Sequence, residues 1–185
     1  MKKFEEKTLS TEKIFDGKVI SLQVDEVELP NGNKSKREII KHPGAVAVIA
    51  ITAENKIVMV EQYRKAMERS LVEIPAGKLE KGEEPLATAH RELEEETGYV
   101  TESMVYVTSF YTSPGFADEL IHLFLAENLK KKEDPASADD DEFVEILELR
   151  LEEAIDYMKQ EKIYDAKTAF AVQYLQLREA TKENG

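Results

Sequence analysis

The chain has 185 residues, which is enough for one substantial core but leaves little room for a second full domain. Apolar residues make up 42% and charged residues 34%, as in soluble globular proteins, and the formal charge of −13 argues against general nucleic-acid binding because an acidic surface repels polyanions. Cysteine is absent, which excludes disulfides, thiolate catalysis and cysteine-ligated zinc.

The N-terminus contains neither the apolar stretch of a secretory signal nor the start of a membrane span. Its first residues read MKKFEEKTLSTEK, and no apolar run anywhere approaches the length that a membrane-spanning helix needs. We therefore expect a cytoplasmic protein with no membrane partner. The three histidines, His42, His90 and His122, are too far apart in sequence to form a histidine-rich metal motif.

Alternating apolar and polar residues predict strands in the first third of the chain. Residues 17–29 alternate with a phase slip at Asp25-Glu26, which predicts a β-bulge there. Pro30-Asn31-Gly32 is a turn signal, after which a strand over 35–42 would pair back. The runs 45–52 and 57–63 predict two further strands, the first buried on both faces.

A helix is predicted over residues 83–97. Leu86, Ala89 and Leu93 lie along one apolar stripe, and Gly98 can provide the C-terminal cap. The remaining predicted elements are strands near 102–112, 119–126 and 142–149, an acidic loop at 132–141, and helices over 151–160 and 166–180. This order predicts an α+β fold in which helices pack on a mixed sheet.

The predicted helix ends in an acidic cluster. Glu92, Glu95 and Glu96 are three or four residues apart and so share one face. Like charges at this spacing repel, and they crowd the helix end at which the macrodipole is already negative. A solvated acidic face is one interpretation. The other is a divalent-cation site, because all-oxygen ligands select Mg²⁺, Mn²⁺ or Ca²⁺ and a cation would relieve both penalties.

The surrounding residues favour the cation site. The segment reads Gly77, five residues, Glu83, seven residues, Arg91-Glu92-Leu93, one residue, Glu95-Glu96, one residue, Gly98-Tyr99. This pattern resembles the Nudix box, G-x5-E-x7-R-E-U-x-E-E-x-G-U, where U is a bulky apolar residue. Every fixed position is filled, and Tyr99 stands where an aliphatic residue is more usual. The resemblance implies a Nudix-type α/β/α sandwich with an N-terminal antiparallel sheet.

The resemblance also implies roles for the matching residues, which from here on we call the Nudix box (residues 77–99). Glu92, Glu95 and Glu96, with the backbone carbonyl of Ala76, are similar to the ligands of Mg²⁺, for which Mn²⁺ could substitute. Arg91 is similar to a residue that pairs with Glu83 to tie the loop to the helix, and a catalytic role for Arg91 stays open alongside Glu95.

Residues outside the box resemble the ADP-ribose pyrophosphatase branch of the family. The segment Glu61-Gln62-Tyr63-Arg64 is similar to an EQ-x-R motif whose arginine grips a substrate phosphate. Arg37 and Glu38 fall where relatives contact adenine. The implied substrate residues of the loop after the box are Pro114, Gly115, Phe116 and Glu119.

The reaction that this resemblance implies is hydrolysis of ADP-ribose to AMP and ribose 5-phosphate. A carboxylate must accept a proton from the attacking water, and Glu142 in the acidic loop is the predicted base, with Asp140 as its rival. Hydrolysis of another nucleoside-diphosphate sugar and a non-catalytic nucleotide sensor are the alternatives. A calcium-binding loop is excluded by spacing, because no DxDxDG pattern is present.

Relatives in this branch are dimers that exchange N-terminal strands, so the resemblance implies a homodimer. We expect residues 1–43 to form an N-terminal strand region for dimerisation and adenine binding. Residues 44–185 would then form the hydrolase domain.

Overall fold

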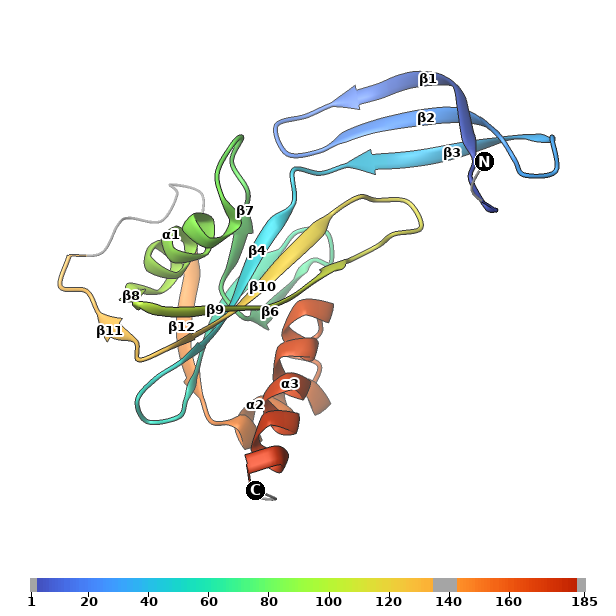
Figure 1. Cartoon of the computed structure of the whole chain (residues 1–185). Coiled ribbons are helices and arrows are strands. Elements are labelled where there is room, and N and C mark those ends of the chain that lie inside the picture. The colour runs from blue at the N-terminus through green and yellow to red at the C-terminus, as the bar shows by residue number, and fades with distance from the viewer. Residues whose placement is uncertain (1–2, 135–142, 183–185) are drawn as a thin grey trace. The chain divides into compact units, whose positions relative to one another are not determined.

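The computed structural model describes residues 3–134 and 143–182, and the chain forms two compact units, which are described separately (Figure 1). One unit comprises the residues up to Ala45 together with Ser109–Ile121. The other comprises Val46–Thr108 and the residues from His122 onward.

The first unit contains a three-stranded antiparallel sheet in the order β1-β2-β3. Its strands are β1 (Lys7–Asp16), β2 (Ser21–Glu28) and β3 (Lys34–Lys41). The turn predicted at Pro30-Asn31-Gly32 is confirmed: Gly32 has φ 84° and its N–H donates to the Leu29 carbonyl at 2.8 Å. Positive φ is the reason that glycine suits this position.

One strand of this sheet was not predicted, and one prediction for the sheet was wrong. β1 was not predicted, because KTLSTEKIFD has no regular apolar alternation. The bulge predicted at Asp25-Glu26 is absent from the β2–β3 ladder, and the register shifts lie in β1 instead, between Thr8 and Ser10 and between Lys13 and Phe15. The apolar phase changes in β2 because Asp25 occupies a buried position. Hydrogen bonds from Thr11 Oγ1 (2.8 Å) and Gln23 Nε2 (2.9 Å) satisfy that carboxylate.

The loop at 112–119 is attached to the end of β3. The Ile40 N–H donates to the Phe116 carbonyl at 2.8 Å, and the Asp118 N–H donates to the Ile40 carbonyl at 3.2 Å. The Asp118 carboxylate also accepts a hydrogen bond from the His42 N–H and forms an ion pair with Lys41, both at 2.8 Å. These contacts fix the loop onto the N-terminal sheet.

The second unit is built on a seven-stranded sheet with the order β12-β5-β4-β10-β9, to which β6 adds on β5 and β7 adds on β4. The strands are β4 (Ala45–Ile51), β5 (Ile57–Arg64), β6 (Arg69–Glu73), β7 (Ala76–Lys78), β9 (Ser103–Tyr111), β10 (Leu120–Glu127) and β12 (Val144–Leu149). A separate pair joins β8 (Tyr99–Val100) to β11 (Lys130–Lys131). Sequence periodicity did not detect β6, β7, β8 and β11, which have five residues or fewer.

Three helices cover the two faces of this sheet: α1 (Pro85–Thr97), α2 (Leu151–Lys159) and α3 (Ala166–Lys182). Ala89 and Leu93 of α1 pack in a core cluster with Val46 and Val48 of β4. Figure 1 shows α2 and α3 on the side of the sheet opposite α1. Strand β4 is therefore buried on both faces, as predicted, and the expected α+β class with helices on both faces of the sheet is confirmed.

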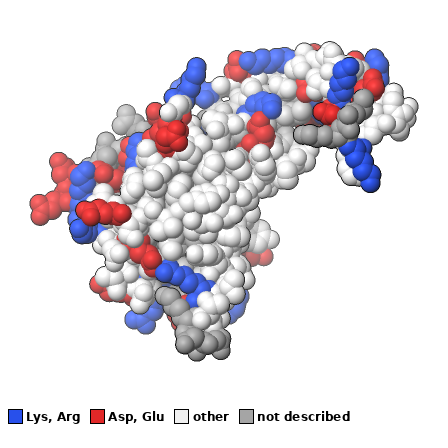
Figure 2. All heavy atoms as spheres, in the orientation of Figure 1, with Lys and Arg blue, Asp and Glu red and all other residues white. Residues whose placement is uncertain are grey.

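The predicted apolar stripe of α1 was wrong at one position, because Leu86 is exposed whereas Ala89 and Leu93 are fully buried. In Figure 2 charged side chains gather toward the edges of the second unit, and uncharged residues cover the middle of the visible face. Val105 and Tyr106 of β9 are among the exposed apolar side chains of the second unit. Within the described ranges, no helix is long and apolar enough to cross a membrane.

Candidate active site

The Nudix box folds as a strand, a loop and a helix. β7 leads through the loop at 79–84 into α1, whose first residue is Pro85, where the missing N–H costs nothing. Gly98 ends the helix with φ 69°, and its N–H donates to the Glu94 carbonyl at 2.8 Å. The helix has no basic residue in its last turn. The glutamates therefore meet the negative end of the macrodipole with no basic residue in that turn, and the cation that α1 supplies, Arg91, lies about one turn earlier.

Two of the three glutamates are buried, which contradicts a solvated acidic face. Glu92 is 8% exposed and Glu96 is 4% exposed. Room for Glu92 comes from Gly77, because a Cβ on Gly77 would lie 1.9 Å from the carboxyl carbon of Glu92. Glycine thus leaves the space that the Glu92 carboxyl group occupies, and any larger residue would force this group to move; the backbone of Gly77 does not adopt the left-handed region.

Arg91 organises the carboxylates around it. Its Nε and Nη2 atoms donate to the two oxygens of Glu83, both at 3.1 Å, and Nη1 donates to Glu92 Oε1 and Glu95 Oε2, both at 2.8 Å. The hydrogen bonds that Arg91 donates to Glu83, and then to Glu95, raise the pKa of Arg91, and the hydrogen bond from Arg91 lowers the pKa of Glu83. The predicted pairing of Arg91 with Glu83 is therefore present.

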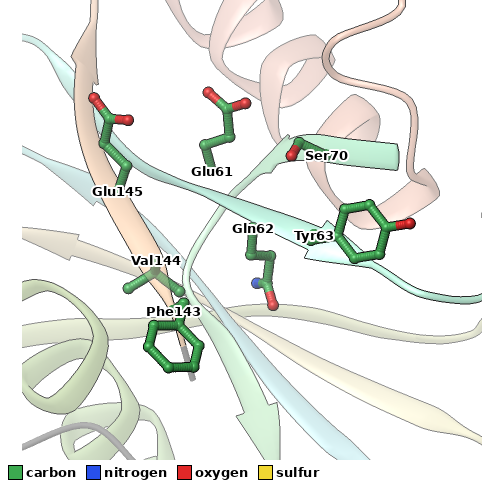
Figure 3. A pocket seen from close by; sticks show the side chains of 7 residues that line it. All are labelled: Glu61, Gln62, Tyr63, Ser70, Phe143, Val144 and Glu145. Carbon is green, nitrogen blue, oxygen red and sulfur yellow. The ribbon is translucent and has the colours of Figure 1, made fainter. Parts of the chain in front are cut away.

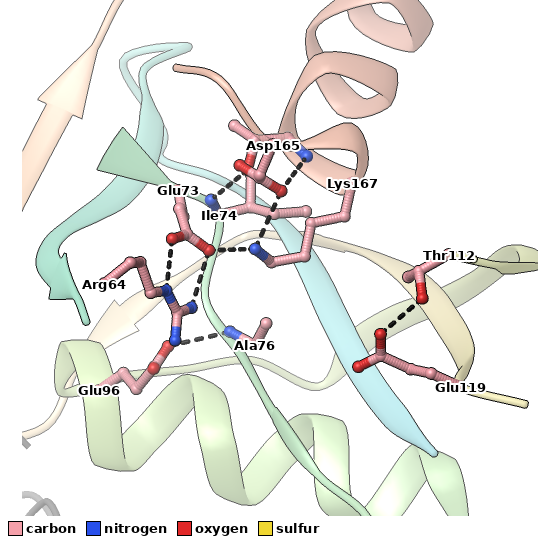
Figure 4. Close-up of polar contacts among 10 residues, drawn as sticks. Arg64, Glu73, Ile74, Ala76, Glu96, Thr112, Glu119, Asp165 and Lys167 are labelled. Carbon is pink, nitrogen blue, oxygen red and sulfur yellow. Dashed lines mark hydrogen bonds and ion pairs between the residues drawn. The ribbon is translucent and has the colours of Figure 1, made fainter. Parts of the chain in front are cut away.

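Glu96 makes a different contact. Its Oε2 accepts a hydrogen bond from the Ala76 N–H at 2.9 Å, which joins the end of α1 to the residue just before the box (Figure 4). Val48 N–H donates to the neighbouring Pro75 carbonyl at 2.8 Å. The backbone at 75–76 is therefore held between β4 and α1, and the residue whose carbonyl was expected to bind metal is fixed against one of the glutamates.

The donor set fits a hard divalent cation. Glu83, Glu92, Glu95 and Glu96 carry four negative charges against the single positive charge of Arg91, and every donor is oxygen. Burial of two of these carboxylates makes the excess charge costly without a cation. Among the described residues, no three acidic or histidine side chains converge on one point: Arg91 Nη1 bonds both Glu92 and Glu95, whereas Glu96 bonds the Ala76 N–H.

Arg64, the predicted phosphate-binding arginine, is held by a residue that the sequence did not single out. Its Nε and Nη2 donate to the Glu73 carboxylate at 2.6 and 2.8 Å (Figure 4). Lys167 of α3 donates to the same carboxylate. Burial alone would raise the pKa of Glu73, but the hydrogen bonds from Arg64 and Lys167 outweigh burial and lower it. The Glu73 hydrogen bond also raises the pKa of Arg64, and the charge of Glu96 adds to this.

Next to Arg64, strands β5, β6 and β12 line an open hollow of about 560 Å³ (Figure 3). Glu61 and Gln62 of the EQ-x-R segment line it from β5, and Glu145 stands directly across from Glu61 on β12. Tyr63 and Phe143 are its exposed aromatic residues. The EQ-x-R motif was the one sequence feature that pointed to this hollow, and the apolar periodicity of the strands did not predict it.

The other predicted substrate residues lie in the first unit. Arg37 of β3 donates to both oxygens of Glu6, at 2.6 and 2.8 Å, and Glu38 pairs with Val24 in the sheet. Phe116 is exposed, and Gly115 has open space where a Cβ would stand. Glu119 accepts a hydrogen bond from Thr112 Oγ1 at 2.6 Å and lies 3.7 Å from His42 Nε2.

The structure thus sorts the predicted residues into two groups. The first group is the box cluster with Ala76. Arg64 belongs with it, because the negative charge of Glu96 acts on Arg64 and helps to raise its pKa. The second is held on the N-terminal sheet, where Pro114 belongs to the loop fixed on β3. The predicted base Glu142 and its rival Asp140 lie outside the described residues.

Comparison with known proteins defines the class. The NUDIX domain matches residues 41–170, and the nucleoside diphosphate sugar hydrolase N-terminal domain matches residues 6–40. The chain belongs to the Nudix hydrolase family and is an enzyme of that family.

Two relatives in this family resemble the chain over almost its whole length, and a third covers most of it. It is 68% identical over 181 residues to the methanol dehydrogenase activator of Bacillus methanolicus, covering 98% of each chain. It is 63% identical over 180 residues to the ADP-ribose pyrophosphatase of Bacillus subtilis (strain 168), covering 97% of each. The GDP-mannose pyrophosphatase of Cronobacter sakazakii is 37% identical over 153 residues, covering 78% of this chain and 80% of that protein.

The fold recurs in a solved structure. The crystal structure of an ADP compounds hydrolase superposes with a TM-score of 0.82 at 18% sequence identity, covering 98% of this chain and 96% of that one. The expected Nudix-type fold is therefore confirmed.

Proposed function

We propose that this protein hydrolyses the diphosphate bond of ADP-ribose, with Mg²⁺ as cofactor and Mn²⁺ as a substitute, and releases AMP and ribose 5-phosphate. The observation that carries the proposal is the 63% identity to an ADP-ribose pyrophosphatase over nearly the full chain, in a sequence whose box positions are all filled. The nucleoside diphosphate sugar hydrolase N-terminal domain at residues 6–40 supports the same substrate class.

In this proposal Glu92, Glu95, Glu96 and the Ala76 carbonyl hold the metal. When bound, divalent ions neutralise charge that develops on the phosphates during hydrolysis. Gly77 lets Glu92 approach β7, and Arg91 holds Glu92 and Glu95 in place at 2.8 Å until cations compete for them. Arg91 then acts mainly through its fixed pairing with Glu83.

Substrate binding is assigned to two sets of residues. Arg64 binds a phosphate, because its guanidinium is half-exposed and is oriented by Glu73. Arg37 and Glu38 contact the adenine, and Pro114, Gly115, Phe116 and Glu119 form a loop near the diphosphate. Glu142 accepts the proton of the attacking water, with Asp140 as the alternative base.

A product assay tests this function. The protein is incubated with ADP-ribose and Mg²⁺, with and without EDTA, and AMP and ribose 5-phosphate are quantified. We expect both products in equal amounts, and no reaction in EDTA. Competition with GDP-mannose and NADH ranks the substrates, and negligible turnover of ADP-ribose beside rapid turnover of another nucleotide sugar would replace ADP-ribose with that substrate.

We further propose that the protein is a cytoplasmic homodimer that exchanges its N-terminal strands. The support is β1, a ten-residue strand in which every residue is exposed in the single chain, including Leu9, Ile14 and Phe15. A strand of this length usually buries one face. Sedimentation velocity of the purified chain tests the dimer, and a monomer at micromolar concentration would contradict it.

A second candidate function is activation of an alcohol dehydrogenase. It is favoured by the 68% identity to the methanol dehydrogenase activator. Adding this chain to a methanol dehydrogenase and measuring its rate tests the idea. An activation that disappears in the Glu96→Gln variant would show that the hydrolase site produces it, whereas no activation would remove this function and leave the first intact.

A further inference from the structure

Four charged side chains form a line from the residue before α3 to the end of β5, and the line is buried at its centre. In order they are Asp165, Lys167, Glu73 and Arg64, so that negative and positive groups alternate (Figure 4). Asp165 precedes α3, and its Oδ1 accepts hydrogen bonds from Lys167 Nζ at 3.0 Å and from the Thr168 N–H at 3.1 Å. We call this set the α3 charge relay.

Exposure falls sharply toward the middle of the relay. The side chains of Glu73 and Lys167 are 2% and 10% exposed, whereas that of Arg64 is 38% exposed. Arg64 is therefore the end of the relay that a ligand can reach. Arg64 donates its two hydrogen bonds to Glu73 from Nε and Nη2, and this pair of bonds sets the plane of the Arg64 guanidinium.

Lys167 decides how firmly Glu73 is held. Both oxygens of Glu73 accept from Arg64, and Oε2 also accepts from Lys167, which lies 94 residues further along the chain. A buried carboxylate with a single flexible partner can swing with that partner, but a third hydrogen bond from a buried ammonium removes this freedom. Asp165 in turn fixes the ammonium, because Lys167 bonds its Oδ1.

The same part of α3 also holds the backbone that enters the Nudix box. The Ile74 N–H donates to Thr168 Oγ1 at 3.1 Å, one residue after Glu73 and one residue after Lys167. Ala76 then donates to Glu96. The first turn of α3 thus bonds the Glu73 side chain through Lys167 and the Ile74 backbone through Thr168. Glu73 and Ile74 belong to the segment that leads into the Nudix box.

We propose that Lys167 is a positioning residue for substrate binding: it holds Glu73 and thereby fixes the Arg64 guanidinium toward a phosphate group of the substrate. The proposal rests on the proposed function, in which Arg64 binds a phosphate. It assigns to α3 a part in substrate binding, although α3 lies outside the Nudix box and Lys167 is too buried to touch the substrate itself.

Lys167→Met tests this because it removes the ammonium and keeps the length of the side chain. We expect KM for ADP-ribose to rise about tenfold with kcat changed by less than about twofold, since a hydrogen bond to a charged group contributes roughly this factor. Lys167→Arg keeps the charge and should restore most of the affinity. A rise in KM that is rescued by arginine is not expected from a general loss of stability.

Arg178→Met is the matched control. Arg178 also lies on α3, and its Nη2 makes an ion pair with Glu127 of β10 at 2.8 Å; in the described part of the chain Glu127 bonds Arg178 and Thr101, neither of which belongs to the relay. We expect KM to stay within about twofold of wild type in this variant. Equal rises in KM for both variants would overturn the proposal, because loosening α3 would then be sufficient.

A second measurement does not need turnover. In ¹⁵N–¹H spectra the Arg64 Nε–H, assigned by its loss in Arg64→Lys, should be protected from exchange in the wild type and exchange at least about tenfold faster in Lys167→Met. If Lys167→Met fails to fold, Asp165→Asn replaces it, since asparagine keeps the helix cap but removes the charge that orients Lys167.

The two failures are distinguishable. A wild type that does not hydrolyse ADP-ribose overturns the proposed function, while the exchange of the Arg64 Nε–H still reports whether Lys167 fixes that side chain. A wild type that hydrolyses ADP-ribose, together with an unchanged KM and an unchanged Nε–H exchange in Lys167→Met, overturns the positioning role alone.

Discussion

The Nudix box and strand β1 differ in opposite directions from what their side chains would suggest: charged groups are buried in the box, and apolar groups are exposed in β1. In the box, carboxylates that would repel each other on an isolated helix are buried or half-buried, and Glu92, Glu95 and Glu96 each accept a hydrogen bond from within the same chain. In β1, every residue is exposed, including apolar side chains. The box glutamates thus find hydrogen-bond partners within one chain, whereas the N-terminal sheet has apolar surface that a single chain leaves exposed.

Removing one carboxylate should have the largest effect. We expect Glu96→Gln to reduce kcat about 10²- to 10³-fold, since losing one charge-stabilising group at an active site costs roughly this factor. Glutamine can still accept the Ala76 N–H, so the fold should persist, which circular dichroism checks. Near-wild-type turnover at saturating Mg²⁺ would show that Glu96 does not hold the metal.

Gly77→Ala tests the space that makes burial of Glu92 possible. The new Cβ would overlap the Glu92 carboxyl group, so we expect a loss of about 1–3 kcal/mol in the free energy of unfolding, as for other overpacked sites. Urea denaturation measures this loss. Gly115→Ala is the matched control for stability, because no atom lies within 4 Å of the added carbon and φ is not positive there. Equal stability of both variants would contradict the packing argument.

Ile14→Asp tests the exposed strand. If a second chain covers β1, a charge at Ile14 should raise the dimer dissociation constant by at least about tenfold, because burying an unpaired carboxylate is costly. Sedimentation velocity measures the constant, and Ile14→Thr, which keeps a β-branched side chain, should have a smaller effect. An unchanged association state in Ile14→Asp would mean that β1 lies outside the interface.

The smallest effect should come from pH. The pKa of Glu73 is lowered from its ordinary value of 4.5, chiefly because hydrogen bonds from Arg64 and Lys167 outweigh burial. A lowered folded-state pKa contributes stability that is present above the unfolded-state pKa and is lost as pH falls through the folded-state pKa. The stability difference between wild type and Glu73→Gln should therefore shrink as pH falls below 4.5. A difference that stays constant from about pH 7 to about pH 3 would contradict this.

Much of the second unit could be predicted from the sequence. The run at 45–52 and the helix near 83–97 have strong local patterns, and both were found within two residues of their bounds. β1 could not be predicted, because its ten residues are exposed and no buried face imposes alternation. Asp25 misled the prediction for β2, because a buried, hydrogen-bonded carboxylate imitates a break in the apolar pattern.

The Nudix box could be located from the sequence alone, because spacing along one helix fixes which side chains share a face and which glycines flank it. The family pattern was also sufficient to predict the pairing of Glu83 with Arg91. The burial of Glu92 against Gly77 and the contact of Lys167 with Glu73 could be seen only in the folded chain. Contacts between residues that are 94 positions apart leave no trace in local periodicity, because they depend on how the sheet and α3 pack.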